Sequence, residues 1–162
     1  MNRRIALAAA PLILLAACSS GGGSSESSSS SSSTSATRSV ASCHPTTPST
    51  STAKAATAAK LSNGLKVTSV QETASSTDKS LRDVIVRVCG ATTKGDDLKK
   101  QANAIAKSMK SAADAKTIAS IRVTNVDAED DPAGRVRCDD FQLNTFDGTA
   151  GTEIATWKTA AE

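Results

Sequence analysis

The fold is decided by the stretch Asp83-Val84-Ile85-Val86-Arg87-Val88-Cys89. Its valines recur at every second position, so in an extended chain Val84, Val86 and Val88 share one face while Arg87 lies on the other. The stretch therefore predicts a strand with one buried face.

A helix is predicted next, over residues 94–113. Thr92 or Thr93 can cap its start, and Asp96 and Asp97 lie at its positive end. Apolar residues recur in steps of four and three and form one narrow stripe, made up of Leu98, Ala102, Ile105, Met109 and Ala112. Four lysines lie off this stripe, and we expect them to be solvated: Lys99, Lys100, Lys107 and Lys110.

Three further strands are predicted on either side, over residues 65–70, 118–126 and 136–143. The order strand, strand, helix, strand, strand predicts an α+β fold, in which one helix covers one face of a four-stranded sheet. The connection through the helix should be right-handed. The alternative is an immunoglobulin-like β-sandwich, which Phe141-Gln142-Leu143 before the Asp147-Gly148 turn also suits. The predicted helix counts against it.

The N-terminal part of the chain has a different composition. The basic start Met1-Asn2-Arg3-Arg4 precedes an apolar run that ends in Leu15-Ala16-Ala17-Cys18. A helix of residues 5–17 would span roughly 20 Å, less than a bilayer core. Residues 19–52 are rich in Ser, Thr, Gly and Pro, a composition typical of flexible segments. We therefore divide the chain into residues 1–17, a tether over residues 18–52, and a small globular domain over residues 53–162.

Residues 1–18 resemble a bacterial lipoprotein signal peptide, whose lipobox ends in a cysteine. The resemblance implies that Cys18 is alkylated with diacylglycerol, carries acyl chains such as palmitate, and becomes the N-terminus after cleavage. Two or more acyl chains anchor a protein stably. We therefore expect an exported protein that is lipid-anchored to the outer face of the cell membrane, with the membrane as a partner through Cys18.

Three cysteines remain for disulfide chemistry, namely Cys43, Cys89 and Cys138. At most one bridge forms within the chain, with three pairings to choose from, and an exported protein meets oxidising conditions. We predict Cys89–Cys138, because both lie in predicted strands. If the strands lie in chain order, a third strand holds them roughly 9–10 Å apart. The pairing then requires Cys89 to lie past its strand end, at the bend that Gly90 allows.

Catalytic chemistry is not indicated. His44 is the only histidine and lies in the tether, so a histidine triad inside the domain is excluded. An acidic cluster lacks the spacing of a calcium loop: Asp127, Glu129, Asp130 and Asp131. Residues 79–162 carry 13 basic and 13 acidic side chains. We expect no enzyme activity, no metal, no cofactor and no nucleic-acid partner.

The domain is similar to small α/β lipoprotein domains of bacteria and their phages. The similarity lies in residues 81–88, in the helix start Asp97-Leu98-Lys99-Lys100 and in the ending from Asp147-Gly148 to Trp157. The expected anchor, the long tether and a small near-neutral domain without a catalytic constellation indicate an interaction or binding module of the cell envelope, with an envelope protein or a glycan as partner. A phage-encoded form would act in superinfection exclusion, by blocking the entry of further phage DNA. The alternative is a small-ligand or calcium-binding envelope protein, or a hydrolase, that uses the acidic cluster.

Overall fold

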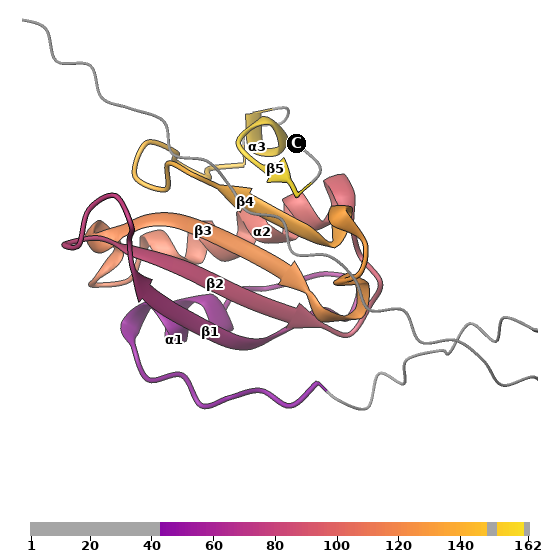
Figure 1. Cartoon of the computed structure of the whole chain (residues 1–162). Helices are drawn as coiled ribbons and strands as arrows, with labels where there is room; N and C mark the ends of the chain where they lie inside the picture. The colour runs from indigo at the N-terminus through magenta and orange to yellow at the C-terminus, as the bar shows by residue number, and fades with distance from the viewer. Residues whose placement is uncertain (1–42, 149–151, 161–162) are drawn as a thin grey trace, which may run out of the picture. The chain divides into compact units, whose positions relative to one another are not determined.

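The structure, a computed structural model, describes residues 43–148 and 152–160, which contain one five-stranded sheet and the helices packed on it (Figure 1). The predicted signal segment, Cys18 and most of the predicted tether lie outside these residues. The mixed α/β class and the order strand, strand, helix, strand, strand are confirmed. The β-sandwich alternative is not what the described residues form, since their strands belong to a single sheet.

The strands lie in the sheet in chain order: β1 (Lys66–Ala74), β2 (Arg82–Cys89), β3 (Ile118–Asn125), β4 (Arg135–Cys138) and β5 (Lys158–Thr159). β2 and β3 run parallel, and the other neighbours are antiparallel. The prediction of four strands was wrong by one, because β5 has too few residues to show an alternating pattern. The fourth predicted strand ends at Cys138 instead of Leu143.

Two helices carry most of the packing on one face of the sheet. α2 (Gly95–Lys110) is the crossover between the parallel strands β2 and β3, and α1 (Ser51–Thr57) lies beside it. Thr50 caps α1 by accepting a hydrogen bond from the Ala53 amide, and Ser108 of α2 donates to the Ala55 carbonyl at 2.6 Å. α3 (Thr152–Ala155) precedes β5. No helix within residues 43–148 and 152–160 has the length and apolarity needed to cross a membrane.

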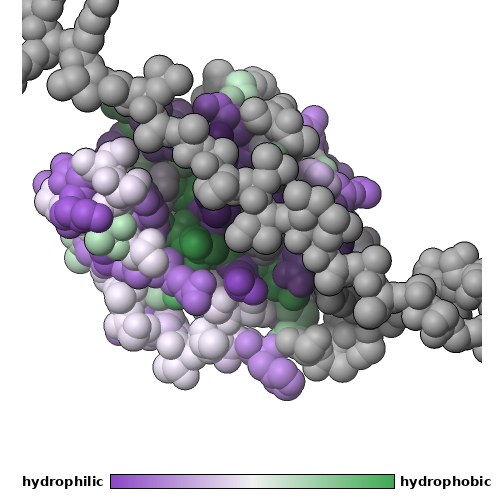
Figure 2. All heavy atoms as spheres, viewed as in Figure 1, coloured by the Kyte–Doolittle hydropathy of each residue, from purple (hydrophilic) through white to green (hydrophobic). Residues whose placement is uncertain are grey.

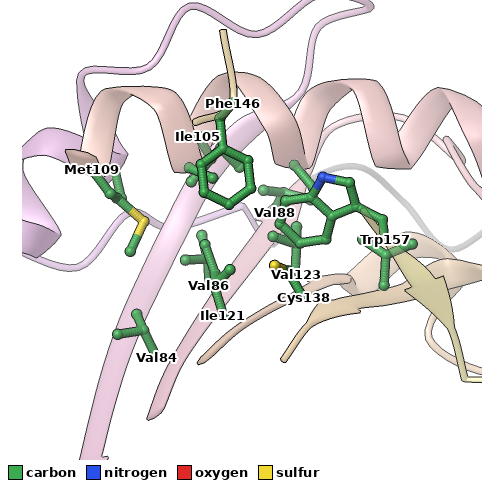
Figure 3. Packing of buried hydrophobic residues seen from close by; sticks show 14 of the residues in the cluster. Val84, Val86, Val88, Ile105, Met109, Ile121, Val123, Cys138, Phe146 and Trp157 are labelled. Carbon is green, nitrogen blue, oxygen red and sulfur yellow. The ribbon is translucent and has the colours of Figure 1, made fainter. Parts of the chain in front are cut away.

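The core lies between the sheet and α2, as the alternation of β2 and the helical stripe predict. Figure 3 shows Val84, Val86 and Val88 directed toward the helix that carries Ile105 and Met109, and all five are essentially inaccessible to solvent. Trp157 and Phe146 close the core at the β4 end. Two of the lysine predictions were wrong. Lys99 is buried, with Nζ 3.6 Å from an Asp96 carboxylate oxygen, and Lys110 is half-buried over the Phe141 ring.

The domain begins earlier than residue 53. Residues 43–50, assigned to the tether, lie along the β1 edge, where the Thr46 amide donates to the Thr68 carbonyl at 2.7 Å. Thr52 is fully buried in α1. Composition alone suggested a tether here, but capping hydroxyls and one backbone hydrogen bond to β1 hold this Ser/Thr-rich segment on the domain.

The predicted Cys89–Cys138 disulfide is wrong: Cys89 is bonded to Cys43, and Cys138 is a buried free cysteine. Cys138 is level with Ile121 and hence with Val84, which lies five residues before Cys89 along β2. The two cysteines are thus separated by two strand spacings, roughly 9–10 Å, and by roughly 17 Å along the strand direction. That distance exceeds what a disulfide can span.

Candidate functional site

Five cations lie on the face of the sheet opposite α1 and α2, and we call this set the basic sheet face: Arg87, Arg122, Arg135, Arg137 and Lys158. All five are exposed. They take this face because side chains alternate along a strand, and their neighbours Val88, Val123 and Val136 are directed into the core. Wherever grey atoms do not hide it, this side of the molecule shows hydrophilic side chains around an apolar patch (Figure 2).

The strand register places these cations directly opposite one another. Arg122 on β3 pairs with Arg137 on β4, which in turn pairs with Lys158 on β5. A second row runs from Arg87 through Thr124 to Arg135. Like charges directly opposite each other in a sheet are destabilising. The row Arg122–Arg137–Lys158 therefore costs stability unless an anion lies close by.

The anions that the domain itself supplies compensate this charge only in part. Asp139 is shared between two cations, with an oxygen 3.0 Å from Lys158 Nζ and another 3.6 Å from Arg137 Nε. Arg122 and Arg135 make neither an ion pair nor a side-chain hydrogen bond with any residue that the structure describes. The same holds for Arg87, so three guanidinium groups of the basic sheet face have no partner among the described residues and are available to a ligand.

A hollow of about 270 Å³ lies among these groups, lined by Arg122, Arg135, Val136, Arg137, Thr159 and Ala160. A second hollow of about 220 Å³ shares Arg122 and Arg137 and extends to Asp83 and Ser120. Guanidinium groups present planar pairs of N–H donors that match the oxygens of phosphate or carboxylate. The arrangement is suited to an oxyanion that carries several negative charges.

The basic sheet face was not predicted from the sequence, because the net charge of the whole domain is near zero. The basic and acidic side chains of the domain cancel in number, but folding places the cations of four strands on one face of the sheet. One signal was present in the sequence, namely the alternation of Arg135 and Arg137 with Val136 and Cys138. That alternation indicates a short strand with a basic outer face.

A second polar cluster joins α1 to the end of the sheet. Arg82 donates to the carboxylate of Glu72, to Thr117 Oγ1 at 2.6 Å and to Asp114, whose oxygen is 3.2 Å away. Burial acts to raise the pKa of Asp114, but hydrogen bonds from Ser51, Thr52 and Arg82 outweigh it and bring the pKa to about 2. Each charge here has a partner within the chain, so the cluster fixes α1 in place.

The acidic cluster predicted from sequence does not converge on one point. The Asp127 carboxylate accepts a hydrogen bond from the Gly90 amide at 2.7 Å. Asp131 caps the turn at Ala133 and pairs with Lys94 at 2.7 Å. Among the described residues, the one group of three candidate metal ligands is Cys43, Cys89 and Asp127. The disulfide leaves it without the thiolates that would bind a metal.

Comparison of the chain with protein-family models, with curated proteins and with solved structures gives no match. The function is therefore inferred from the residues and their geometry.

Proposed function

We propose that the protein is an exported lipoprotein, held on the outer face of the cell membrane by lipid on Cys18, whose α/β domain is a binding module of the cell envelope. The resemblance of residues 1–18 to a lipoprotein signal peptide supports the anchor. The observation that carries the binding role is the register that places Arg122 opposite Arg137, whose charges Asp139 compensates only in part. A domain that gathers unpaired cations on one sheet face is built to hold an anionic partner.

The length of the proposed tether fits this role. Because the disulfide to Cys89 fastens Cys43 to the domain, the proposed tether is the Ser/Thr/Gly-rich stretch before it, residues 19–42. A flexible chain of that composition and length has an r.m.s. span of roughly 27 Å. The domain would remain close to the membrane and to the envelope layer next to it.

The narrower functions stay predictions. A role in superinfection exclusion is compatible with a tethered binding domain, as is an envelope protein or a glycan as partner. A calcium-dependent role or a hydrolase activity has less support, because Asp127 and Asp131 already accept hydrogen bonds within the domain.

The anchor is tested by expressing the full chain in a lipoprotein-processing bacterium with labelled palmitate. We expect the wild type to take up label and to partition into the detergent phase. The Cys18→Ala precursor should be unlabelled, uncleaved and unable to enter the detergent phase as a mature protein. A variant that is processed and retained as well as the wild type would refute the lipid anchor.

A further inference from the structure

We infer that the basic sheet face binds the phosphate groups of anionic phospholipids in the bilayer that carries the anchor. This inference deepens the proposed function and rests on it, because the lipid on Cys18 is what keeps the domain next to that bilayer. The occupant is identified from charge, from the shape of the surface and from the length of the tether.

The row Arg122–Arg137–Lys158 gives the basic sheet face its highest density of positive charge. Neighbouring strands are about 4.8 Å apart, so these three cations extend across roughly 10 Å of a face that α1 and α2 do not cover. The second row adds Arg87 and Arg135. Asp139 supplies one carboxylate to the first row, which leaves an excess of positive charge. An array of phosphates would relieve the repulsion that the register imposes.

The shape of the basic sheet face favours a lipid surface over a single small anion. The cations lie on four strands and around two neighbouring hollows, and neither hollow is lined by all five of them. One phosphate ion can reach two or three of these groups, whereas a plane of head groups can reach all five. Ile85 lies half-buried in the same row as Arg122, so the face also has an apolar element beside its charges. Basic and apolar groups side by side are what binding at a membrane interface requires.

The proposed tether raises the local concentration of the domain at the bilayer. A tether of the proposed composition and length would have an r.m.s. span of roughly 27 Å and would keep the domain within reach of the bilayer, and tethering turns a weak second contact into an intramolecular one. Each Lys or Arg close to an anionic surface strengthens binding by about fivefold. Even a weak basic sheet face would therefore be occupied in the anchored protein.

The test uses the chain from residue 18 onward, produced without its signal segment and with Cys18→Ala, so that binding through lipid is absent. Co-sedimentation is measured with vesicles of equal parts phosphatidylcholine and phosphatidylglycerol, and with vesicles of phosphatidylcholine alone. We expect binding to the anionic vesicles only, and its loss when the salt concentration rises from about 0.05 M to about 0.5 M.

The decisive variant is Arg122→Gln/Arg135→Gln/Arg137→Gln, for which we expect vesicle binding to fall by about 100-fold. Its matched control, Lys54→Gln/Lys60→Gln/Lys116→Gln, removes the same charge from exposed lysines outside the sheet, and it should bind like the wild type. Thermal unfolding checks the fold of both. The arginine variant should unfold at the wild-type temperature or above, since it removes a like-charge pair.

Three results would overturn the inference. Equal losses in the two triple variants would show that net charge alone drives binding. Absence of binding to anionic vesicles, together with calorimetric binding of inorganic phosphate, would show a site for a free anion. Absence of binding to anionic vesicles and to inorganic phosphate would show that the basic sheet face binds neither lipid phosphates nor a free anion. The vesicle assay contains no lipidated protein, so a negative result there says nothing about the lipid anchor. The anchor is tested separately by the palmitate experiment.

Discussion

Cys43 is bonded to Cys89, with their Cα atoms 5.8 Å apart, so the segment that precedes α1 is fastened to the end of β2. The backbone around this bond is closely packed. Gly90 has φ +120°, and a Cβ there would lie 2.3 Å from the Gly64 carbonyl oxygen. The Asp127 carboxylate accepts a hydrogen bond from the Gly90 amide. The disulfide therefore lies at a corner where three segments of the chain meet.

Loss of this disulfide should weaken the domain. Cys43→Ala removes a cross-link between residues 46 positions apart, and we expect the free energy of unfolding to fall by up to about 4 kcal/mol on the chain-entropy account. Denaturant unfolding measures the loss, and non-reducing peptide mapping should yield a Cys43–Cys89 peptide. Recovery of a Cys89–Cys138 peptide would contradict the structure.

Cys138 should be an unreactive thiol in the folded domain. Burial is the main cause that raises its pKa, and the carboxylates of Asp139 and Asp140 raise it further, so the reactive thiolate is scarce at neutral pH. We expect the Cys18→Ala chain to be alkylated at Cys138 only after unfolding without reductant. Rapid alkylation of the native protein at Cys138 would show that the site is open.

The packing of α2 is tested by Ile105→Asp. Ile105 is inaccessible to solvent, and a carboxylate there would be buried without a partner, at a cost of several kcal/mol. The comparison is Lys107→Asp on the exposed side of the same helix, which should change stability by less than about 1 kcal/mol. Similar losses in both variants would show that the helix faces are assigned wrongly.

Gly134 is required by a close backbone approach. A Cβ there would lie 1.9 Å from the Ala128 carbonyl oxygen, so Gly134→Ala must displace backbone, and we expect a loss of about 2–3 kcal/mol in unfolding experiments. Gly95→Ala is the matched control. It meets no atom within 4 Å but has φ +57°, so its cost of about 1 kcal/mol is conformational only. A smaller loss at position 134 than at 95 would contradict this account.

Asp114 should make the domain sensitive to acid. Its pKa is about 2 in the folded state, below the value near 4 of an unfolded aspartate. Its contribution is therefore complete above about pH 4 and is lost as pH falls through 2. Allowing for partial exposure, we expect about 1–2 kcal/mol of stability from this group.

Unfolding free energies measured from pH 6 to pH 2 check this prediction. Asp114→Asn should remove that part of the pH dependence. The double variant Ser51→Ala/Thr52→Ala removes two of the hydrogen bonds that lower the pKa, so its acid-induced loss of stability should be smaller and should be complete at a higher pH. Curves for both variants that coincide with the wild-type curve would refute the role of Asp114.

Local pattern in the sequence was sufficient for β2 and α2. The valines of residues 84–88 recur every second residue, as in a strand, and the apolar residues from Leu98 to Met109 recur every three or four, as in a helix. Each repeat determines which face of its element is buried. The same reasoning did not find β5, because Lys158 and Thr159 are too few to show a period. It misjudged residues 43–50, because a Ser/Thr-rich composition does not distinguish a tether from a segment whose hydroxyls cap a helix.

The sequence by itself determined the mixed α/β class, the β-β-α-β-β order and the buried faces of β2 and α2, since these depend on neighbours a few residues apart. Only the tertiary structure decided that Cys43, and not Cys138, is the partner of Cys89. Only the structure showed that Arg122, Arg137 and Lys158 form one row. Both depend on which strands lie side by side and in what register, and contacts between residues far apart in the chain determine that register.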